Sequence, residues 1–425
     1  MRNRTPKVTI LGLNYSPEPT GIAPYTAGLA SGLAGLGWQV RAVTAFPHYP
    51  AWEISDGYVG KTLSEELEGV AVTRLRPYMP RNPSGLRRLA MEIHFGVRSA
   101  IAPWGGPDVV VLVSPALFAV AIAQFRARVS IQRPQVIVWV QDLYSLGVTE
   151  TGALGGRSAR LMARVESWVL RSADEVVVIH DRFKKYAVTS LGVDAERVEV
   201  VRNWTHLPPR RLEGEGYRMK FGWGDEIVAL HAGNMGAKQA LENVVEAARL
   251  ADKAGALVRF VLLGNGNQRD ALLQLATGIE RIEFIEPLGD ADFQGAMEAA
   301  DILLVNEKPG VAEMAVPSKL TSYFASNRPV VAATDAGSIT ADEVATARAG
   351  IRVDAGKPEE LLAAVISLGE NRRLSRTLGE NGREYQQAVL TSKAAISHYA
   401  EIITSLAGTR GRRARAFRPS TRGKI

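Results

Sequence analysis

The chain has 425 residues and a net charge of +7, and it is 46% hydrophobic and 22% charged. These values are typical of a globular protein with about two domains. The absence of cysteine excludes disulfides, thiolate metal sites and a cysteine nucleophile. The basic start has no long apolar segment or cleavage site, so we expect no signal peptide. The longest apolar run, Val109–Ala123, is too short to span a bilayer.

The first elements predict a βαβ opening. An apolar strand is expected at Lys7–Asn14, and a helix then leads to a second strand at Trp38–Ala45. The loop between the first strand and the helix lies at the carboxyl edge of a parallel sheet, where ligands bind. Its Gly21 either lets a ligand approach the backbone or is an ordinary turn glycine. The loop has no GxGxxG pattern, so a dinucleotide is not indicated.

Aromatic residues and prolines surround His48 in the loop after the second strand, Phe46–Trp52. They either stack on an acceptor or cap the sheet, and packing with partial exposure is the favoured interpretation. The next segment, Ser84–Ile101, has apolar residues at helical spacing and a second face with Arg87 and Arg98. Such a helix packs on a core with a basic solvent face, or it lies on an anionic membrane.

Strands and helices then alternate to about residue 201, which predicts a parallel sheet covered on both faces. Asp142 follows the strand Gln135–Val140, at the carboxyl end where side chains face a ligand. It is a candidate general base or acceptor-binding group, or it caps the next segment. The other strands expected in this half are 108–113, 174–179 and 197–201.

A domain boundary is expected where Asn203–Arg211 and the glycine-rich segment after it interrupt the alternation. The second half restarts with strands at 227–232, 258–263, 282–285 and 301–305, separated by helices. Two such α/β halves leave a cleft between them, which is a preferred place for small ligands.

Three segments of the second half predict an anion site at one sheet edge. The loop after strand 227–232 contains Gly233, Asn234, Gly236 and Lys238, and the loop after strand 258–263 contains Gly264, Asn265 and Gly266. Glycines let the backbone approach a phosphate, and lysine offers a point charge to it. The GxxxxGK[ST] spacing is absent, so this is not a P-loop.

The third segment follows strand 301–305. A polar loop with Glu307, Lys308, Gly310 and Glu313 leads to a helix that begins at Pro317-Ser318-Lys319. The free amides at a helix start, its dipole and Lys319 bind anions. A carboxylate accepts hydrogen bonds from hydroxyls, so the pair would suit a sugar diphosphate; an ordinary strand–helix loop is the alternative.

The residues after Ala407 carry seven basic side chains and no acid: Arg410, Arg412, Arg413, Arg415, Arg418, Arg422 and Lys424. We expect this tail to be disordered. Nucleic acid, an anionic membrane face and plain solvation are the three interpretations that the tail permits.

The combination of motifs resembles a known family. G-N-M-G-A-K-Q, L-L-G-N-G and V-P-S-K-L-T-S-Y-F-A-S-N-R-P-V-V are similar to the donor domain of family-4 retaining glycosyltransferases with the GT-B fold. N-Y-S-P-E-P-T-G-I-A-P-Y-T, F-P-H-Y-P-A-W and Q-D-L agree with the first domain. The similarity covers about Lys7 to Ala407 and is greatest for enzymes of exopolysaccharide and colanic acid biosynthesis.

This resemblance implies two Rossmann-like, doubly wound parallel-sheet domains facing across a cleft. The expected division is 1–205 for the acceptor, 206–390 for the nucleotide-sugar donor, a helix at 391–407 packing back on the first domain, and the basic tail at 408–425. Gly21 matches the glycine loop that faces the donor phosphate, and Lys238 matches the basic residue on the diphosphate. Gly264 and Gly266 match the loop near the nucleoside.

The chain departs from the family pattern at several positions. Asn234 stands where many relatives have arginine, and Met314 and Ser322 stand where many have a glutamate pair. Glu313 is the candidate for the sugar-binding acid, although it lies one place out of register. Ser318 and Lys319 are expected to replace part of the glutamates' function. Gln141, followed by Asp142, replaces a first-domain histidine, and His48 is the other candidate on the acceptor side.

The implied reaction moves a sugar from a nucleotide diphosphate sugar to an acceptor hydroxyl with retention. Lys238, Lys319 and the loop amides would stabilise the leaving diphosphate. No DxD-like pair stands in a suitable loop, so we expect no divalent metal, and no cofactor is expected. The resemblance implies that the acceptor enters on the leaving-group face, so no protein nucleophile is expected. The implied donor is GDP-fucose or a UDP-hexose, and the acceptor a saccharide or lipid-diphosphate-linked saccharide.

These expectations place the enzyme in the cytoplasm at the inner membrane face. The Ser84–Ile101 helix, together with the arginines at 81, 87, 88 and 98, would contact anionic lipid there, and no nucleic acid is expected as a partner. The alternatives are a nucleotide-sugar epimerase of the same shape and a non-catalytic nucleotide-sugar-binding partner.

Overall fold

The computed structural model describes residues 5–18, 21–49, 51–80, 85–145, 156–205, 214–310 and 318–416. The chain forms two compact units, and each is described by itself. Unit 1 comprises Met1–His206 and Ser392–Ile425, and unit 2 comprises Leu207–Thr391. The two boundaries between the units, at 206/207 and 391/392, each lie within a residue or two of the boundary expected from the sequence. Within the described ranges, no helix has the length and apolar character needed to cross a membrane.

Unit 1 contains an eight-stranded sheet in the order β3-β4-β2-β1-β5-β6-β7-β8. Central strand β5 is buried at all six positions, as expected for a strand with helices on both faces. Its strands are β1 (Lys7–Leu11), β2 (Gln39–Ala45), β3 (Thr62–Leu67), β4 (Val70–Leu75), β5 (Val109–Ser114), β6 (Gln135–Val140), β7 (Glu175–Val178) and β8 (Val198–Val200).

The hairpin formed by β3 and β4 was not predicted. The parallel pattern of the sheet ends at β4, because β3 pairs with it antiparallel. Glu68 and Gly69 both have positive φ in the two-residue turn, which suits a tight hairpin. Strand β3 is exposed at four of its six positions and therefore lacks the apolar run that marks a buried strand. Its Glu65 side chain accepts a hydrogen bond from the fully buried Arg74 of β4.

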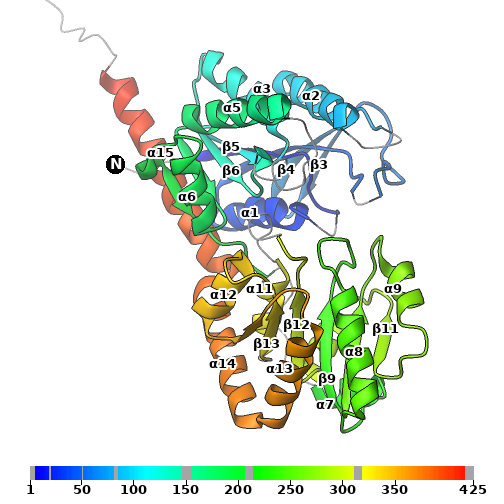
Figure 1. Cartoon of the computed structure of the whole chain (residues 1–425). Helices are drawn as coiled ribbons and strands as arrows, with labels where there is room; N and C mark the ends of the chain where they lie inside the picture. Colours follow the sequence, from blue (N-terminus) through cyan, green and yellow to red (C-terminus); the bar gives the residue numbers. More distant parts are fainter. Residues whose placement is uncertain are drawn as a thin grey trace, which may run out of the picture. The chain divides into compact units, whose positions relative to one another are not determined.

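Helices cover both faces of this sheet (Figure 1). Helices α2 (Gly85–Ile101), α3 (Leu117–Val129) and α5 (Gly156–Ser172) lie together on one face, and α1 (Ala23–Gly35) packs with α15 (Ser392–Ala416) on the other. A further short helix of the unit, α6 (Asp181–Thr189), follows β7.

Helix α15 completes the core of unit 1, although it comes last in the sequence. Its Ala395, Tyr399 and Ile403 are buried at intervals of four residues, so one stripe of the helix faces the sheet. The Tyr399 ring lies 5.2 Å from that of Trp139 on β6. The close approach of α15 to α1 uses Gly32, where a β-carbon would collide with Ile396.

The expectation of disorder from residue 408 is wrong for the first part of the tail. Helix α15 continues to Ala416, and residues 417–425 lie outside the described part of the chain. Arginine has a high helix propensity, and extending an existing helix avoids the cost of a new nucleus.

Unit 2 contains a six-stranded sheet in the order β11-β10-β9-β12-β13-β14. Every paired strand in it is parallel, as predicted for a doubly wound domain. Its strands are β9 (Ile227–Ala232), β10 (Val258–Leu263), β11 (Ile282–Ile285), β12 (Ile302–Asn306), β13 (Val330–Ala333) and β14 (Gly350–Val353).

Two apolar clusters form the core of unit 2, one on each face of the sheet. One contains Val244 of α8 and Leu361 of α13, and the other contains Met297 of α10 and Leu320 of α11. The helices are α7 (Gly214–Lys220), α8 (Glu242–Ala254), α9 (Arg269–Leu275), α10 (Asp290–Ala299), α11 (Ser318–Ala325), α12 (Ile339–Ala347), α13 (Pro358–Glu370) and α14 (Arg372–Val389).

Candidate active site

The carboxyl edge of the unit 2 sheet brings together the loops that the sequence singled out. The loops after β9 and β10 are held against each other by backbone hydrogen bonds. The Gly233 amide donates to the Leu263 carbonyl at 2.8 Å, and the Met235 amide donates to the Asn265 carbonyl at 2.9 Å. Two segments that lie about thirty residues apart in the sequence therefore form one continuous surface.

Glycine is required where these two loops meet. A β-carbon on Gly264 would lie 2.1 Å from the Gly233 carbonyl oxygen, and Gly264 has a φ of 131°. A β-carbon on Gly266 would lie 2.4 Å from the Met235 carbonyl oxygen. These two glycines therefore serve close loop packing, whereas their expected role was access to a phosphate.

Lys319 lies over the first loop, at the start of α11. Its Nζ and Cε are 3.8 Å from the position that a β-carbon on Gly233 would occupy. The Nζ is also 3.4 Å from Nε2 of His231, at the end of β9. The ammonium group therefore lies close to the backbone at Gly233, whose φ of 135° favours glycine.

Burial controls the charge of both side chains. Burial lowers the pKa of Lys319 to about 8, and the Glu307 carboxylate opposes this shift. Burial and the neighbouring ammonium hold the pKa of the His231 imidazole well below its usual range. His231 is therefore neutral near pH 7, and Lys319 carries most of the positive charge at this point.

A carboxylate was expected in the loop after β12 to accept hydrogen bonds from sugar hydroxyls. Among the described residues of this loop, Glu307 is the carboxylate that matches this expectation. Its two oxygens accept hydrogen bonds from the hydroxyls of Thr334 and Thr340, which are both buried. Burial raises the pKa of Glu307, while the two hydroxyls and Lys319 lower it. Glu313, the carboxylate predicted to bind the sugar, lies outside the described residues, as does Pro317.

Lys238 belongs to the same edge but is exposed. Its carbonyl oxygen accepts a hydrogen bond of 2.8 Å from the Lys308 amide, which joins the β9 and β12 loops. Asn306 supports the same loop, since its side-chain amide donates to the Gln239 and Ala240 carbonyls at 2.8 and 2.9 Å. Asn306 and His231 were not predicted as site residues; both are polar residues at strand ends, which was the available signal.

The remaining donor-side candidates occupy this edge with different exposure. Asn234 is exposed, Gly236 is half-buried, and the Gly236 amide donates to the Gln239 side chain at 3.1 Å. The Gly266 amide donates to the Asn265 side chain at 2.7 Å. Ser318 is the first residue of α11, so the helix begins where the sequence placed it.

In unit 1, Gly21 and His48 lie in neighbouring loops linked by Glu18. The buried Glu18 carboxylate accepts hydrogen bonds from the amides of His48 and Tyr49 at 2.8 and 2.9 Å. Gly21 has a φ of 69° and is exposed, and its β-carbon position is 3.4 Å from the Tyr49 ring. The His48 side chain is only 2% exposed, so the partial exposure expected in this loop belongs to Tyr49 and Trp52. Its ring forms a hydrogen bond with the Phe46 carbonyl, which explains why the loop turns it inward.

Gln141 and Asp142 follow β6, as predicted. Gln141 is buried and forms a reciprocal amide pair with Asn203, at 2.8 and 3.3 Å. Asp142 is half-buried. Next to them, Glu166 of α5 accepts hydrogen bonds from the amides of Tyr144 and Ser145 at 2.6 and 3.0 Å. The acid with the clearest structural role here is therefore Glu166, which fixes the segment after β6.

The unit 2 edge has the chemistry of an anion site. Two lysines, closely packed glycine loops and the start of α11 supply positive charge and backbone donors, and Glu307 balances part of the charge. A diphosphate that carries a sugar matches this arrangement. Its phosphates need the hydrogen-bond donors and the positive charge, and the hydroxyls of its sugar need an acceptor such as the Glu307 carboxylate.

Comparison with known proteins agrees with this architecture. Sucrose-phosphate synthase from Thermosynechococcus elongatus superposes with a TM-score of 0.73 at 17% identity, covering 96% of this chain and 100% of that chain. Anabaena HepE in complex with UDP superposes with a TM-score of 0.67 at 16% identity, covering 94% of this chain and 100% of the HepE chain. The two parallel-sheet α/β units therefore have the GT-B fold, as predicted.

Sequence similarity assigns the family. Residues 20–204 match the glycosyl transferase 4-like domain, and residues 226–371 match glycosyl transferases group 1. The putative colanic acid biosynthesis glycosyl transferase WcaI of Escherichia coli K12 is 33% identical over 339 residues, which are 75% of this chain and 81% of that protein. The chain belongs to the group 1 glycosyltransferases with a 4-like first domain, and the resemblance inferred from its loop motifs is confirmed.

Proposed function

We propose that the protein is a retaining glycosyltransferase that uses a nucleotide diphosphate sugar. The observation that carries this proposal is the position of Lys319, whose ammonium lies beside Gly233 and His231 at the edge where the glycine loops meet. As the glycosidic bond breaks, negative charge accumulates on the leaving diphosphate. A preorganised cation and backbone donors stabilise that charge without reorganisation at the moment of reaction.

Each donor-site residue has a distinct part in this proposal. Lys319 and the exposed Lys238 neutralise the diphosphate, so no divalent metal and no cofactor are needed. Glu307 accepts hydrogen bonds from the sugar or maintains the charge of Lys319. Ser318 adds a donor at the start of α11. The acceptor hydroxyl attacks from the side of the leaving group, so retention needs no protein nucleophile.

We further propose that the acceptor is a saccharide linked to a lipid diphosphate, at the inner face of the cell membrane. The name of the Escherichia coli relative supports a role in exopolysaccharide or cell-envelope biosynthesis. The donor is then GDP-fucose or a UDP-hexose, and the UDP-glucose complex of Anabaena HepE favours the second. Gly21, His48, Gln141 and Asp142 are the proposed acceptor-side residues.

A thermal-shift screen of UDP, GDP, dTDP and ADP sugars tests the donor site. We expect one nucleotide class to raise the melting temperature of the full chain, and Lys238→Ala to abolish that shift. Lys253→Ala, an exposed lysine on α8, is the matched control and should keep the shift. A shift that survives Lys238→Ala unchanged would remove Lys238 from the site.

Product analysis with the donor thus identified tests the reaction. Transfer to an acceptor with the anomeric configuration kept supports the proposal. Conversion of the nucleotide sugar without an acceptor would indicate an epimerase, and binding without turnover on any acceptor would indicate a non-catalytic partner.

A further inference from the structure

Three neighbouring helices of unit 1 expose large apolar side chains. On α2, Leu86 and Ile101 are 81% and 79% exposed, and Ile93 and Val97 lie on the same stripe. On α3, Phe125 and Val129 are each 63% exposed, and on α5 Trp168 is 51% exposed. Because α3 packs against both α2 and α5, these side chains form one outer face, which we call the apolar face.

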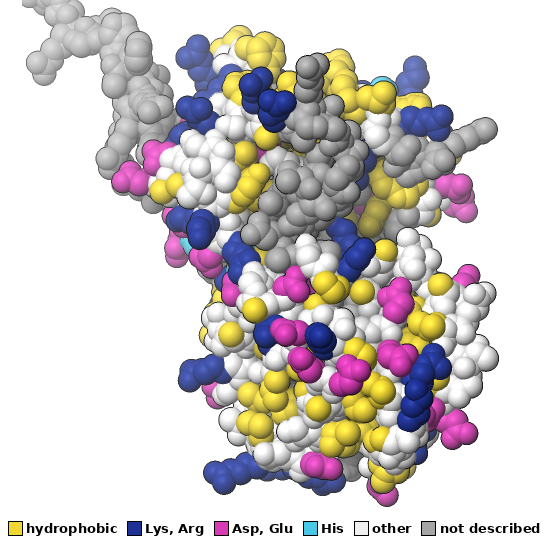
Figure 2. Space-filling model, viewed as in Figure 1, with side chains coloured by type: hydrophobic (Ala, Val, Ile, Leu, Met, Phe, Trp, Pro, Cys, Tyr) yellow, Lys and Arg dark blue, Asp and Glu magenta, His cyan; other side chains and the backbone are white. Residues whose placement is uncertain are grey.

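The same helices carry positive charge and no exposed acid. Their only acids, Glu92 and Glu166, are 1% and 2% exposed and face inward. Exposed arginines accompany the apolar side chains at positions 87, 128, 160, 164 and 171. Figure 2 shows hydrophobic and basic side chains together on the side of unit 1 that these helices cover. Arg128 pairs with Asp174 at 3.5 Å, while the three helices themselves expose no acid. An apolar surface with arginines around it matches an anionic lipid surface.

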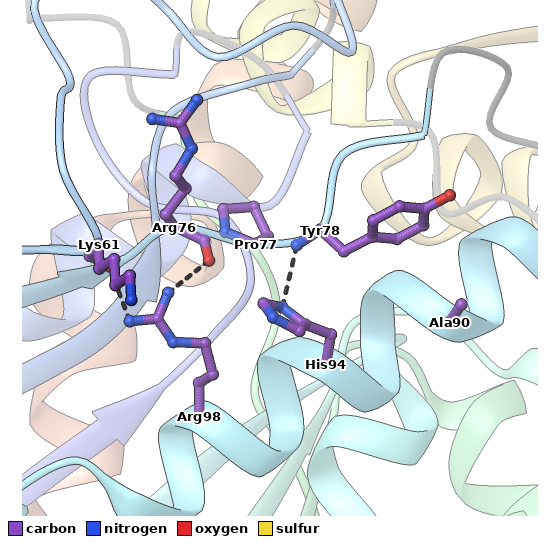
Figure 3. A pocket seen from close by; sticks show the side chains of 7 residues that line it. All are labelled: Lys61, Arg76, Pro77, Tyr78, Ala90, His94 and Arg98. Atoms are coloured by element: carbon purple, nitrogen blue, oxygen red, sulfur yellow. Dashed lines mark hydrogen bonds between the residues drawn. The ribbon is translucent and has the colours of Figure 1, made fainter.

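A groove of about 720 Å³ lies beside the apolar face, between α2 and the segment after β4 (Figure 3). None of the residues that line the groove is acidic. They are Lys61, Arg76, Pro77, Tyr78, Ala90, His94 and Arg98. The α2 residues that line it, at positions 90, 94 and 98, are next to the exposed stripe at 93 and 97. The groove and the apolar face are therefore adjacent sides of one helix.

Hydrogen bonds to the backbone fix the floor of this groove. The Arg98 guanidinium donates to the Arg76 and Lys61 carbonyls at 2.7 and 2.8 Å, so its charge meets no carboxylate there. The Tyr78 amide donates to Nδ1 of His94 at 3.0 Å, which leaves Nε2 as the protonated nitrogen. Figure 3 shows these hydrogen bonds. Lys61 and Arg76 are exposed.

We propose that this groove binds the phosphate of an anionic lipid headgroup while the apolar face inserts into the surrounding bilayer. Lys61 and Arg76 attract the phosphate, and the His94 Nε2–H donates a hydrogen bond to it. The inference rests on the proposed function in one respect, because it names the surface by which an enzyme with a lipid-linked acceptor reaches the membrane.

Vesicle flotation of the full chain tests the assignment. Vesicles of phosphatidylcholine alone are compared with vesicles that also contain phosphatidylglycerol. Each cation near an anionic surface changes partitioning about fivefold. We therefore expect Lys61→Ala with Arg76→Ala to lower binding to anionic vesicles at least tenfold. Lys253→Ala with Arg376→Ala removes the same charge from exposed positions of unit 2 and should leave binding within twofold.

Further measurements distinguish lipid binding at the groove from binding of other ligands. Val97→Asp on the apolar face should also reduce flotation, whereas 10 mM glycerol phosphate should not displace the protein from vesicles. Equal effects of the groove and control variants, full displacement by glycerol phosphate, or a groove-dependent affinity for single-stranded RNA equal to that for vesicles would each overturn the proposal. The nucleotide thermal shift of the groove variant should be unchanged, so failure here is distinguishable from failure of the donor-site proposal.

Discussion

Lys319 is a cation whose charge depends on pH within the range where enzymes are assayed. Its pKa of about 8 lies below the ordinary value because burial disfavours the ammonium form. We expect kcat/KM for the nucleotide sugar to fall about tenfold per pH unit above about 8, because this parameter reports the free enzyme. The measurement is a pH profile of initial rates at low donor concentration.

Lys319→Arg is the matched variant for this profile. A guanidinium remains charged to far higher pH, so the fall near pH 8 should disappear even if the absolute rate drops. The same fall in the arginine variant would assign it to another group. For stability the sign is opposite: the folded-state pKa is depressed, so the unfolded chain binds more protons between about pH 8 and 10 and stability rises with pH.

Single residues were predictable from sequence where the chemistry needs only local context. Lysines and glycines after apolar strands predict an anion site, and Gly233, Lys238 and Lys319 do lie on one sheet edge. Glu307 was undervalued because its setting depends on Thr334 and Thr340, about thirty residues later in the chain. The position of the His48 backbone likewise depends on Glu18, thirty residues before it, whose carboxylate accepts a hydrogen bond from the His48 amide.

The loops after β9 and β10 pack so closely that the backbone of one leaves no room for a side chain on the other. Gly264→Ala would place a β-carbon against the Gly233 carbonyl, which is backbone and cannot rotate away. We expect loss of the nucleotide thermal shift and destabilisation of about 2–4 kcal/mol, as is usual for strain at a left-handed position in a packed site. Chemical denaturation monitored by circular dichroism measures the second effect.

Gly289→Ala provides the control at this scale. Gly289 precedes α10 with a φ of −66°, and a β-carbon there would meet nothing within 4 Å. Because Gly289 is the N-cap of α10, where alanine is less favourable than glycine, its substitution should cost no more than about 1 kcal/mol. Equal stability of the two alanine variants would show that the loops relax apart, and the donor surface would then be less rigid than the hydrogen bonds indicate.

Most elements followed from periodicity, because buried parallel strands are apolar runs and the helices between them repeat at 3.6 residues. Strands β9, β10 and β11 have the predicted bounds. Strand β3 was not predicted because it is polar and exposed, so its pairing depends on β4 rather than on its own pattern. Strand β4 was also not predicted, although it is apolar and mostly buried. The extension of α15 to Ala416 was not predicted, because its arginines were interpreted as solvated charges of a disordered tail.

At the scale of the whole molecule, the last helix in the sequence belongs to the core of the first unit. Ending the chain at Thr391 would remove Ala395, Tyr399 and Ile403 from the sheet face that Trp139 occupies. We expect this truncation to lower the melting temperature of unit 1 by more than about 10 °C or to make the protein insoluble. Ending the chain at Ala407 instead keeps those side chains and should leave the melting temperature within about 2 °C.

A point substitution separates packing from chain length. Tyr399→Ala should destabilise unit 1 by about 3–5 kcal/mol, because it leaves a cavity beside Trp139. Tyr399→Phe is the control, since the buried Tyr399 hydroxyl has no hydrogen-bond partner among the described residues and its loss should be neutral or stabilising. The core of unit 2 contains none of these side chains, so the nucleotide thermal shift should persist in Tyr399→Ala. Loss of that shift with intact unit 2 folding would mean that the donor site depends on unit 1, which the placement of its loops within a single sheet edge argues against.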